Sequence, residues 1–490
     1  MFKPSEKQQE IFDTWNTTDS NILINAVAGS GKTTTLLELL QYCKYRTLFL
    51  AFNKSVQEEI QSKIDEKGLK QGKSMTMHSL GLMAIRHHYK GKKVVIQSGK
   101  NFDIIKKLQA ANKPIFKKMY WKDKLALSYT LMDMNDISRL FLTNDIPEIK
   151  KHLKSMDKSF TVHKDIVSLW LGFVKLREAS YKEKNIVIDF NDMIYLAARD
   201  NLKIPLDPYY LMVDEAQDLN LAQHKLVENL IKQGNIIKWI AVGDRNQSIY
   251  GFSGAYSSSF DKFKSMGTKE LPLDICYRCA RNIIDETNEV YDVMEYGKEE
   301  EGIVSTMTDI SDVKPDSMII CRNTSPIIKL YFGLLGTGTP AYIKGDDIMQ
   351  SITRFLKPYM NYTVAGAKQE LIYELEECQA DKTEVGRIKL YVFKENYANF
   401  KALIANMSTD YEKISVLMDK VKNLFKVKAK AVMLCTIHKA KGLESDVVYI
   451  LNENLIPSKF ANSPEQLKQE QNLKYVARSR AKKELYYLNL

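Results

Sequence analysis

The segment AVAGSGKTT, residues 26–34, follows the apolar residues 21–25 and places two glycines shortly before a lysine and two threonines. Backbone N–H groups of such a loop point at a bound triphosphate, and the N-terminus of the helix that follows favours negative charge. In the general pattern the lysine neutralises phosphate oxygens and the next hydroxyl holds Mg²⁺, although that pattern has glycine where this chain has Ala26. The segment predicts a nucleotide-binding loop made of Ala26, Ala28, Gly29, Ser30, Gly31, Lys32, Thr33 and Thr34.

Apolar, strand-like runs recur along the whole chain, and turns with glycine or aspartate follow them. They lie at residues 21–25, 46–52, 210–213, 236–242, 317–321, 431–436 and 447–451. Stretches with helical periodicity separate these runs, which is typical of parallel α/β sheets with phosphate loops at the carboxyl ends of strands. Two segments, residues 86–188 and 346–427, are mostly helical in pattern and heavily charged. The sequence therefore predicts an α/β fold with two RecA-like P-loop cores, each interrupted by a helical insertion.

These insertions divide the chain into six expected parts. The first core takes residues 1–85 and 189–273 around an insertion at residues 86–188. The second core takes residues 274–345 and 428–490 around a shorter insertion at residues 346–427.

Positive charge is concentrated in the first insertion. The formal net charge of the chain is +11, and residues 86–185 hold 22 Lys and Arg against 10 Asp and Glu. Lysines are interspersed there with aromatic residues such as Phe102, Tyr120 and Trp170, a mixture suited to neutralising phosphates and stacking bases. A solvated, lysine-rich helical surface with an aromatic core would have the same composition, so both interpretations stay open at this point.

Composition narrows the class of protein. The six cysteines are scattered, which favours a reducing compartment, and the pair Cys276 and Cys279 lacks a second Cys or His pair at zinc-binding spacing. The apolar runs are too short to cross a bilayer, and the N-terminal residues lack the apolar stretch of a signal peptide. We expect a cytoplasmic protein without membrane contact.

Acidic and polar residues follow two of the predicted strands. Asp214 and Glu215 come directly after residues 210–213, where a P-loop enzyme needs a metal carboxylate and a base that activates water. The segment GDRNQSIYGF follows residues 236–242, so that Gln247 could sense the γ-phosphate. Tyr250 and Phe252 could stack on bases. The alternatives are a strand end with solvated acids and two rings that pack under their own loop.

In this order, AVAGSGKTT, VDEAQD and GDRNQSIYGFSGA resemble motifs of the UvrD/Rep-type superfamily 1A DNA helicases. Gln8 resembles the glutamine that reads adenine in this family, with Gln9 as its neighbour. LAFNKSVQEEI and TMHSLG are similar to strand-contacting segments and are spelled most like the F-box DNA helicase branch. The resemblance implies DNA contacts for Phe52, Asn53, Lys54, His78, Tyr250, Phe252 and His438. For His78, a turn-capping or core histidine is the alternative.

The second half of the chain continues the resemblance. DICYRC places Tyr277 where the family stacks adenine and Arg278 where it contacts the γ-phosphate. TIHKAKGLESDVV, with Lys441, Gly442 and Glu444, resembles the segment that joins the strand site to the ribose. YVARSRAKKELYYL places Arg480 as the arginine finger, and IDFNDMI matches a further family segment.

The chain also departs from the family pattern. Phe252-Ser253 stands where the family has Trp-Arg, so a ring is kept and a cation is lost. Thr34 stands where many relatives have an arginine beside adenine, so base selectivity could be relaxed. The second insertion is shorter than the regulatory subdomain of UvrD-type relatives.

The resemblance implies an ATP-dependent, Mg²⁺-requiring DNA helicase that moves 3′ to 5′ on single-stranded DNA, in replication, recombination or repair. Expected partners are single-stranded DNA and junctions of single and double strands, with replication or recombination proteins, and we expect a monomer. Two alternatives remain: an ATPase stimulated by single-stranded DNA that displaces proteins or acts as a repair scaffold without unwinding, and an RNA helicase.

Overall fold

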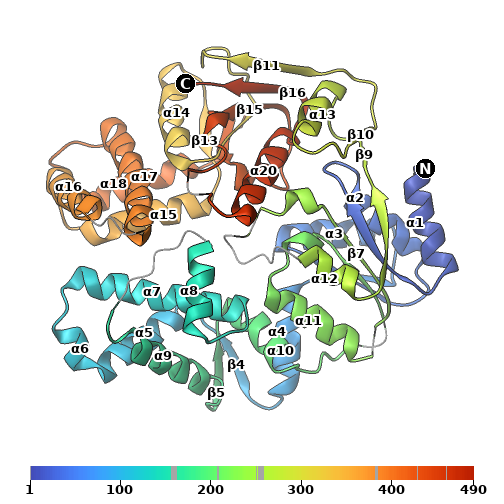
Figure 1. Ribbon diagram of the computed structural model, residues 1–490, viewed down its shortest axis with the longest axis horizontal. Helices are drawn as coiled ribbons and strands as arrows, with labels where there is room; N and C mark the ends of the chain where they lie inside the picture. Colours follow the sequence, from blue (N-terminus) through green and yellow to red (C-terminus); the bar gives the residue numbers. More distant parts are fainter. Residues whose placement is uncertain are drawn as a thin grey trace. The chain divides into compact units, whose positions relative to one another are not determined.

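A computed structural model describes residues 2–155, 163–206, 209–234, 236–249, 251, 259–380, 384–427, 429–459 and 461–490. The chain forms two compact units, unit 1 at residues 1–274 and unit 2 at residues 275–490 (Figure 1). Each unit is built on a six-stranded sheet whose neighbouring strands are all parallel. The prediction of two parallel α/β cores is confirmed.

Unit 1 has the sheet order β3-β2-β6-β7-β1-β8. The strands are β1 (Asn21–Ala26), β2 (Thr47–Ala51), β3 (Gly72–Thr76), β6 (Tyr209–Val213), β7 (Ile236–Gly243) and β8 (Thr268–Leu273). All five residues of β2 are buried, as expected for a parallel sheet covered on both faces. Asn25 pairs with Gly243 and Val213 with Ala241, so β1, β6 and β7 end at the same edge of the sheet.

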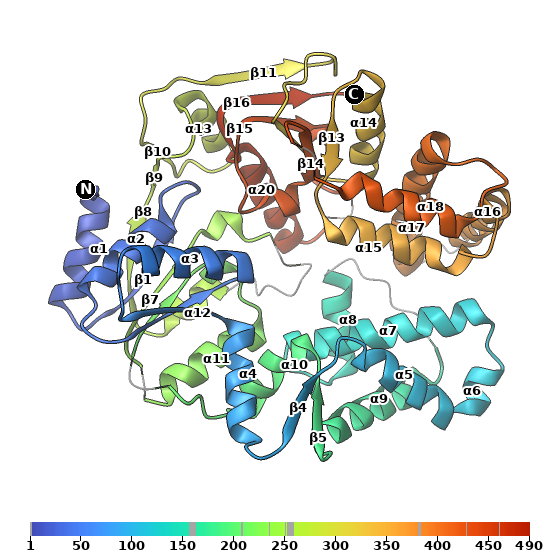
Figure 2. The ribbon, with the colours of Figure 1, turned by 180° about the vertical axis from the view of Figure 1, so that it is seen from behind.

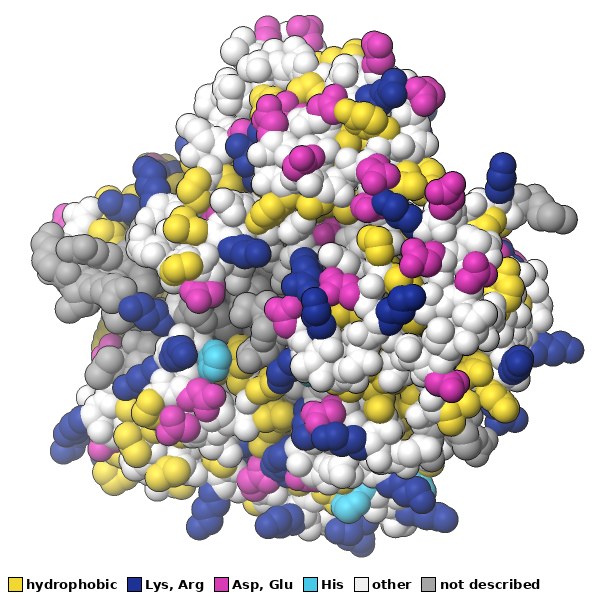
Figure 3. Space-filling model, turned by 45° about the vertical axis from the view of Figure 1, so that its right-hand side comes forward, with side chains coloured by type: hydrophobic (Ala, Val, Ile, Leu, Met, Phe, Trp, Pro, Cys, Tyr) yellow, Lys and Arg dark blue, Asp and Glu magenta, His cyan; other side chains and the backbone are white. Residues whose placement is uncertain are grey.

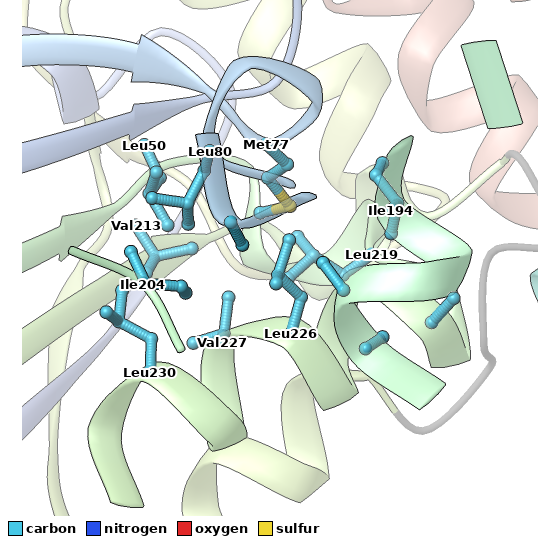
Figure 4. Close-up of a cluster of buried hydrophobic side chains, with 14 of the residues drawn as sticks. Leu50, Met77, Leu80, Ile194, Ile204, Val213, Leu219, Leu226, Val227 and Leu230 are labelled. Atoms are coloured by element: carbon cyan, nitrogen blue, oxygen red, sulfur yellow. The ribbon is translucent and has the colours of Figure 1, made fainter. Parts of the chain in front are cut away.

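The helices that cover this sheet lie mostly between successive strands. They are α1 (Glu6–Thr17), α2 (Lys32–Leu39), α3 (Lys54–Glu66), α4 (Met77–His88), α10 (Phe190–Arg199), α11 (Leu221–Lys232) and α12 (Ser259–Ser265), with short 3-10 turns at Leu40–Tyr42, Ala216–Asp218 and Arg245–Gln247. Figure 4 shows part of the core on one side of the sheet, where Leu50 and Val213 from the strands meet Leu80 of α4 and Val227 of α11.

Between α4 and α10 the chain leaves the sheet and forms a mostly helical segment (Figure 2). It contains β4 (Lys93–Ile96), α5 (Lys100–Ala111), α6 (Lys113–Lys117), α7 (Trp121–Leu140), α8 (Ile146–Ser155), α9 (Ile166–Ser180) and β5 (Asn185–Ile188). Leu131, Trp170 and Phe173 belong to a hydrophobic cluster separate from those around the sheet. This segment, called the first insertion below, therefore has a core of its own.

Unit 2 has the sheet order β11-β16-β15-β12-β14-β13. Its elements are β9 (Ile275–Cys276), α13 (Arg281–Asn288), β10 (Glu295–Tyr296), β11 (Ile303–Met307), β12 (Met318–Cys321), α14 (Thr324–Gly336), β13 (Ala341–Ile343), α15 (Asp346–Leu356), α16 (Val364–Ala380), α17 (Glu384–Met407), α18 (Ile414–Val421), β14 (Val432–Thr436), α19 (Ile437–Ala440), β15 (Ser445–Leu451), α20 (Pro464–Arg478) and β16 (Ala481–Leu488). Leu371, Phe400 and Leu417 of the helices α16 to α18 share one hydrophobic cluster with Ile319 and Leu434 of the sheet. The second helical segment therefore has no separate core among the described residues.

The part of the chain that the structure describes contains no helix with the length and apolarity needed to span a bilayer.

Helices α4 and α10 approach each other closely at Gly81. A Cβ atom at this position would lie 2.1 Å from the Met193 carbonyl oxygen of α10. The glycine of the TMHSLG segment is thus required for packing, because any larger side chain would push the two helices apart.

We expect Gly81→Ala to lower the free energy of unfolding by about 1–3 kcal/mol, the usual cost of overpacking. Urea denaturation would measure it. Gly336→Ala is the control, since its Cβ would meet nothing within 4 Å, and alanine is the better helix former. Equal midpoints for Gly81→Ala and the unsubstituted protein would contradict the packing argument.

Candidate functional site

The glycine-rich loop lies between β1 and α2, at the carboxyl edge of the first sheet. Gly29 and Gly31 have φ angles of 72° and 79°, a region that favours glycine. The Ser30 hydroxyl donates to the Val27 carbonyl over 2.9 Å and closes the loop on itself. Gly31 is the N-cap of α2 and has no side chain to offer, so the first N–H groups of this helix are left for a ligand. This geometry suits a phosphate group.

Lys32 and Thr33 start α2, and Asp214 follows β6 at the same sheet edge. The Thr33 hydroxyl donates to Asp214 Oδ2 over 3.3 Å. The Asp214 side chain is almost completely buried, with 2% of its residue surface exposed. Burial and the neighbouring Glu215 raise the pKa of Asp214 to about 7, although Lys32 and Thr33 oppose this shift. The structure thus brings Lys32, Thr33 and Asp214 together.

A hydroxyl and a buried carboxylate are the oxygen donors that Mg²⁺ takes when it also binds phosphates. Ionised Asp214 carries a desolvation cost that a nearby cation would relieve. Thr33 and Asp214 therefore fit as the protein groups that would hold Mg²⁺, which when bound would offset negative charge on the phosphates. Glu215 is adjacent and has a φ angle of 50°, unusual for a residue other than glycine.

Gln217 connects the acidic segment to the segment after β7. Its Nε2 donates to Glu215 Oε2 over 2.5 Å, and its Oε1 accepts from the Asp244 backbone N–H over 3.0 Å. Gln247 Nε2 in turn donates to Asp244 Oδ2 over 2.7 Å. A Cβ at Gly243 would lie 2.4 Å from Gln217 Oε1, so a larger side chain there would displace this amide. The sequence candidates did not include Gln217, although it lies inside the VDEAQD motif.

The two glutamines at the N-terminus have different surroundings. Gln8 is buried, completes a capping box with Ser5, and donates from Nε2 to the Thr35 hydroxyl over 2.9 Å. Gln9 is exposed and bonds to Asp13 of its own helix. Gln8 is therefore the one that contacts the helix after the nucleotide-binding loop.

Ala26 and Ala28 are both buried, whereas Thr34 is exposed on α2. The small side chain at Ala26, where the general pattern has glycine, packs into a hydrophobic cluster around the sheet.

The predicted strand-contacting residues of unit 1 lie at the starts of helices. Asn53 is the N-cap of α3 and accepts from the Val56 N–H over 2.9 Å. Lys54 forms an exposed ion pair with Glu58, and Phe52 is half-buried. The side chain of Asn53 thus already has a local structural use. Tyr250 and Phe252 lie outside the described residues.

His78, in the first turn of α4, stacks on Phe190, the first residue of α10. The ring centroids are 3.7 Å apart and the planes are inclined by 20°. Burial lowers the pKa of His78 to about 4, so its ring is neutral near pH 7. Phe190 is 59% exposed, which leaves an aromatic surface beside a neutral ring. Phe190 was not a sequence candidate, and an aromatic residue next to a helix N-cap in IDFNDMI was the available signal.

In unit 2, three predicted nucleotide contacts from distant segments come together. Arg278 forms an ion pair with Glu444 over 2.6 Å and donates from NH1 to the Ser479 carbonyl over 3.3 Å. Arg480 is buried and donates to the carbonyls of Val476 and Leu443 over 2.9 and 3.1 Å. Arg278, Glu444 and Arg480 therefore form one cluster within this unit.

The other candidates of unit 2 border this cluster or the helix α19. Tyr277 is 39% exposed, and Gly442 has a φ angle of 82°. His438 lies in α19. Burial, Arg322 and Lys441 lower the pKa of His438 to about 3, so this histidine is neutral near pH 7.

Two parallel α/β units with a P-loop, a buried acidic residue and a second-unit arginine cluster define a P-loop nucleotide-binding protein. Residues 5–267 match the model of the UvrD/REP helicase N-terminal domain, and residues 207–489 match that of the UvrD-like helicase C-terminal domain. The chain belongs to the UvrD/Rep helicase family, which confirms the resemblance found in the sequence.

Among similar proteins is the ATP-dependent DNA helicase PcrA of Staphylococcus epidermidis, 28% identical over 293 residues, which are 56% of this chain and 38% of that protein. PcrA of Leuconostoc citreum is 28% identical over 296 residues, 56% of this chain and 37% of that protein. The matches thus span well under half the length of these relatives. The solved arterivirus nonstructural protein 10 (helicase) aligns over 96% of this chain and 59% of that one, with 11% identity and a TM-score of 0.35. That likeness is too low to carry an argument.

The raised pKa of Asp214 predicts a pH-dependent stability in nucleotide-free protein in EDTA. The folded state keeps the proton up to about pH 7, whereas the unfolded state releases it near about pH 4. Over this range the unfolded state binds fewer protons, so stability falls as pH rises. Relative to Asp214→Asn, the unsubstituted protein should lose on the order of a few kcal/mol between about pH 5 and about pH 8.

Urea denaturation at both pH values measures this difference, and Asp123→Asn, which changes an exposed side chain of α7, is the control. Parallel pH profiles for Asp214→Asn and the unsubstituted protein would refute the inferred pKa of Asp214.

Proposed function

We propose that this protein is an ATP-dependent DNA helicase or translocase that moves 3′ to 5′ on single-stranded DNA and couples ATP hydrolysis to strand separation. The observation that carries the proposal is the approach of Thr33, just after the glycine-rich loop, to the buried Asp214. The chain also matches both helicase domain models. The proposed setting is replication, recombination or repair.

In this proposal Lys32 and the loop N–H groups bind the phosphates, while Thr33 and Asp214 hold Mg²⁺. Glu215 orients and deprotonates the attacking water, and its bond from Gln217 keeps its carboxylate in place. Gln247 is linked to Gln217 through Asp244. We propose that Gln247 contacts the γ-phosphate and shifts when it is lost, which would move the proposed strand-binding segment that follows.

From unit 2 we propose that Tyr277 stacks on adenine, that Glu444 binds the ribose, and that Arg278 and Arg480 stabilise charge on the γ-phosphate in the transition state. In the structure Arg278 forms an ion pair with Glu444. The proposed ribose ligand and the proposed catalytic cation are therefore in direct contact, which would couple nucleotide binding to the position of Arg278.

For the strand we propose contacts by Phe52, Asn53, Lys54 and His78 of unit 1 and, separately, by His438 of unit 2. Phe190 is added because its exposed ring stacks on His78. Both histidines are neutral near pH 7 because burial lowers their pKa. They would therefore contribute stacking and hydrogen bonds to the strand and no charge.

Lys32→Ala should lower ATP hydrolysis by at least about 100-fold, because electrostatic stabilisation of the phosphates is lost, while basal binding of single-stranded DNA remains. Steady-state hydrolysis with and without single-stranded DNA measures this. Lys73→Ala, which changes an exposed lysine of β3 outside the nucleotide loop, is the control and should keep the unsubstituted rate. Normal turnover by Lys32→Ala would rule out this mechanism.

The alternative is an ATPase stimulated by single-stranded DNA that displaces bound proteins or acts as a repair scaffold without unwinding. The observation that favours it is the second helical segment, which shares the core of unit 2. Strand displacement on a duplex with a 3′ or a 5′ tail separates the two functions and gives the polarity. Poly-U RNA in the same ATPase assay tests an RNA substrate.

The basic first insertion is proposed to supply salt-dependent affinity. Part of the visible surface in Figure 3, along its lower edge, carries mainly Lys and Arg side chains. Lys107, Lys113, Lys117 and Lys118 are exposed on α5, α6 and the turn after it.

Changing these four lysines to glutamate should flatten the slope of log affinity against log salt by roughly 0.7 for each phosphate that the protein no longer neutralises. Fluorescence anisotropy with a labelled oligonucleotide at several salt concentrations measures the slope. The control reverses four exposed lysines of unit 2, Lys413, Lys426, Lys430 and Lys459. Equal slopes for the two sets would favour a solvated surface without a role in binding.

A further inference from the structure

Two carboxylates in the first turn of α10 cap the helix and also form ion pairs with the first insertion. Asp189 is the N-cap of α10 and Asp192 completes its capping box, with bonds of 3.0 and 2.9 Å to each other's backbone N–H groups. Both side chains also receive cations from the first insertion. The position of this helix start therefore depends on residues outside α10.

Arg139 of α7 is the central cation. Its NH1 lies 2.5 Å from Asp189 Oδ1 and 2.9 Å from Asp192 Oδ1, and its NH2 lies 2.7 Å from Asp136. Lys100 of α5 donates to Asp192 Oδ2 over 2.6 Å. The Tyr181 hydroxyl, just after α9, donates to Asp192 Oδ1 over 2.6 Å. Three separate parts of the insertion thus converge on one turn.

The charged side chains of Arg139 and Asp192 are buried away from solvent, so water cannot replace a lost ion-pair partner. The side chains of Arg139 and Asp192 are 1% and 0% exposed. Burial alone would raise the pKa of Asp192, but Arg139 and Lys100 outweigh it and hold that pKa below its usual value. Removal of one partner would leave a buried, uncompensated charge, so the turn would have to move or open.

The same turn carries Phe190, whose exposed ring stacks on His78. Gly81 of α4 packs closely against Met193 of α10 and fixes the two helices against each other. His78 is therefore positioned by α4 and Phe190 by the first turn of α10. A shift of the first turn would separate the two rings while leaving the rest of α10 packed.

We propose that Arg139 is a positioning residue, which uses the first insertion to fix the Phe190–His78 ring pair in the geometry that a nucleic-acid strand contacts. The inference rests on the proposed function for strand binding by this pair. It assigns the insertion a role in shaping the strand site, in addition to any contribution of its surface lysines.

A matched control must separate positioning of the ring pair from general destabilisation of the insertion, and Arg177 of α9 provides it. Its side chain is also fully buried, at 0% exposed, and it lies in the same insertion. Its partners Asn135, Ser138 and Asn144 belong to the insertion, and its one bond to α10 reaches Tyr195, beyond the first turn. Arg177→Lys therefore perturbs the insertion without touching Asp189 or Asp192.

The test is a double-mutant cycle on the affinity for fluorescent oligo-dT, measured by anisotropy without nucleotide. Phe190→Ala should weaken binding about ten-fold, the scale of removing one stacked base. Arg139→Lys keeps the charge but loses the fork and should weaken binding several-fold. In the Phe190→Ala background, Arg139→Lys should have no further effect, and Arg177→Lys should have none in either background.

If the effects of Arg139→Lys and Phe190→Ala multiply, or if Arg139→Lys leaves affinity unchanged, the positioning role is overturned while strand binding by the ring pair stands. If Phe190→Ala itself changes nothing, the ring pair is not a strand contact and the inference falls. Stimulation of ATP hydrolysis by DNA then decides separately whether the proposed function survives.

Should Arg139→Lys fail to fold, Tyr181→Phe takes its place in the cycle, because it removes only the hydroxyl that donates to Asp192. A smaller loss of affinity that vanishes in the Phe190→Ala background supports the proposal. Unchanged affinity of Tyr181→Phe, or a loss that persists in that background, overturns it.

Discussion

Burial of the Asp214 carboxylate at the carboxyl edge of the first sheet is the constraint on which the nucleotide site depends. The parallel strand order brings the end of β6 to the same edge as the end of β1. There Asp214 has a hydroxyl from Thr33 and the charge of Lys32 nearby, yet burial still raises its pKa. Ionisation of this carboxyl is thus unfavourable in the folded protein, and cations bound with a nucleotide would relieve that cost. Ligand affinity of this kind is obtained at the expense of stability.

The strands that the sequence predicted share one physical property. β1, β2, β6, β7, β12, β14 and β15 lie inside their sheets, where burial on both faces selects continuous apolar runs. The sequence did not predict β3, β8, β11 and β13, which are the edge strands of the two six-stranded sheets. It also did not predict β16, in which only Ala481, Leu485 and Leu488 are fully buried. An edge strand needs fewer apolar residues, so its pattern resembles that of a loop or a short helix.

Site residues that depend on neighbouring residues in the sequence could be predicted, whereas those that depend on distant segments could not. The loop at residues 26–34 and the acids after β6 could be predicted because each is a run of neighbouring residues in the sequence. Gln217 and Phe190 were not among the predicted site residues, because each has a partner far along the chain, Asp244 and His78 respectively. The pairing of Arg278 with Glu444 joins two segments whose proximity only the second sheet creates. Asn53 shows the reverse case, since a helix N-cap is a local feature that its sequence context already favours.

The two helical segments are attached to their sheets by different combinations of contacts. The first insertion has its own hydrophobic core and meets α10 through buried ion pairs, while Tyr181, Ile186 and Ile188 near its end join the core of the sheet. Such contacts hold one geometry, because a small shift leaves charges unpaired. The helices α15 to α18 instead share apolar contacts with the sheet of unit 2. Rotating them as a body would expose that core to water at about 25 cal/mol for each Å² uncovered. A helical segment attached in this way cannot rotate independently without exposing part of the core of unit 2 to water.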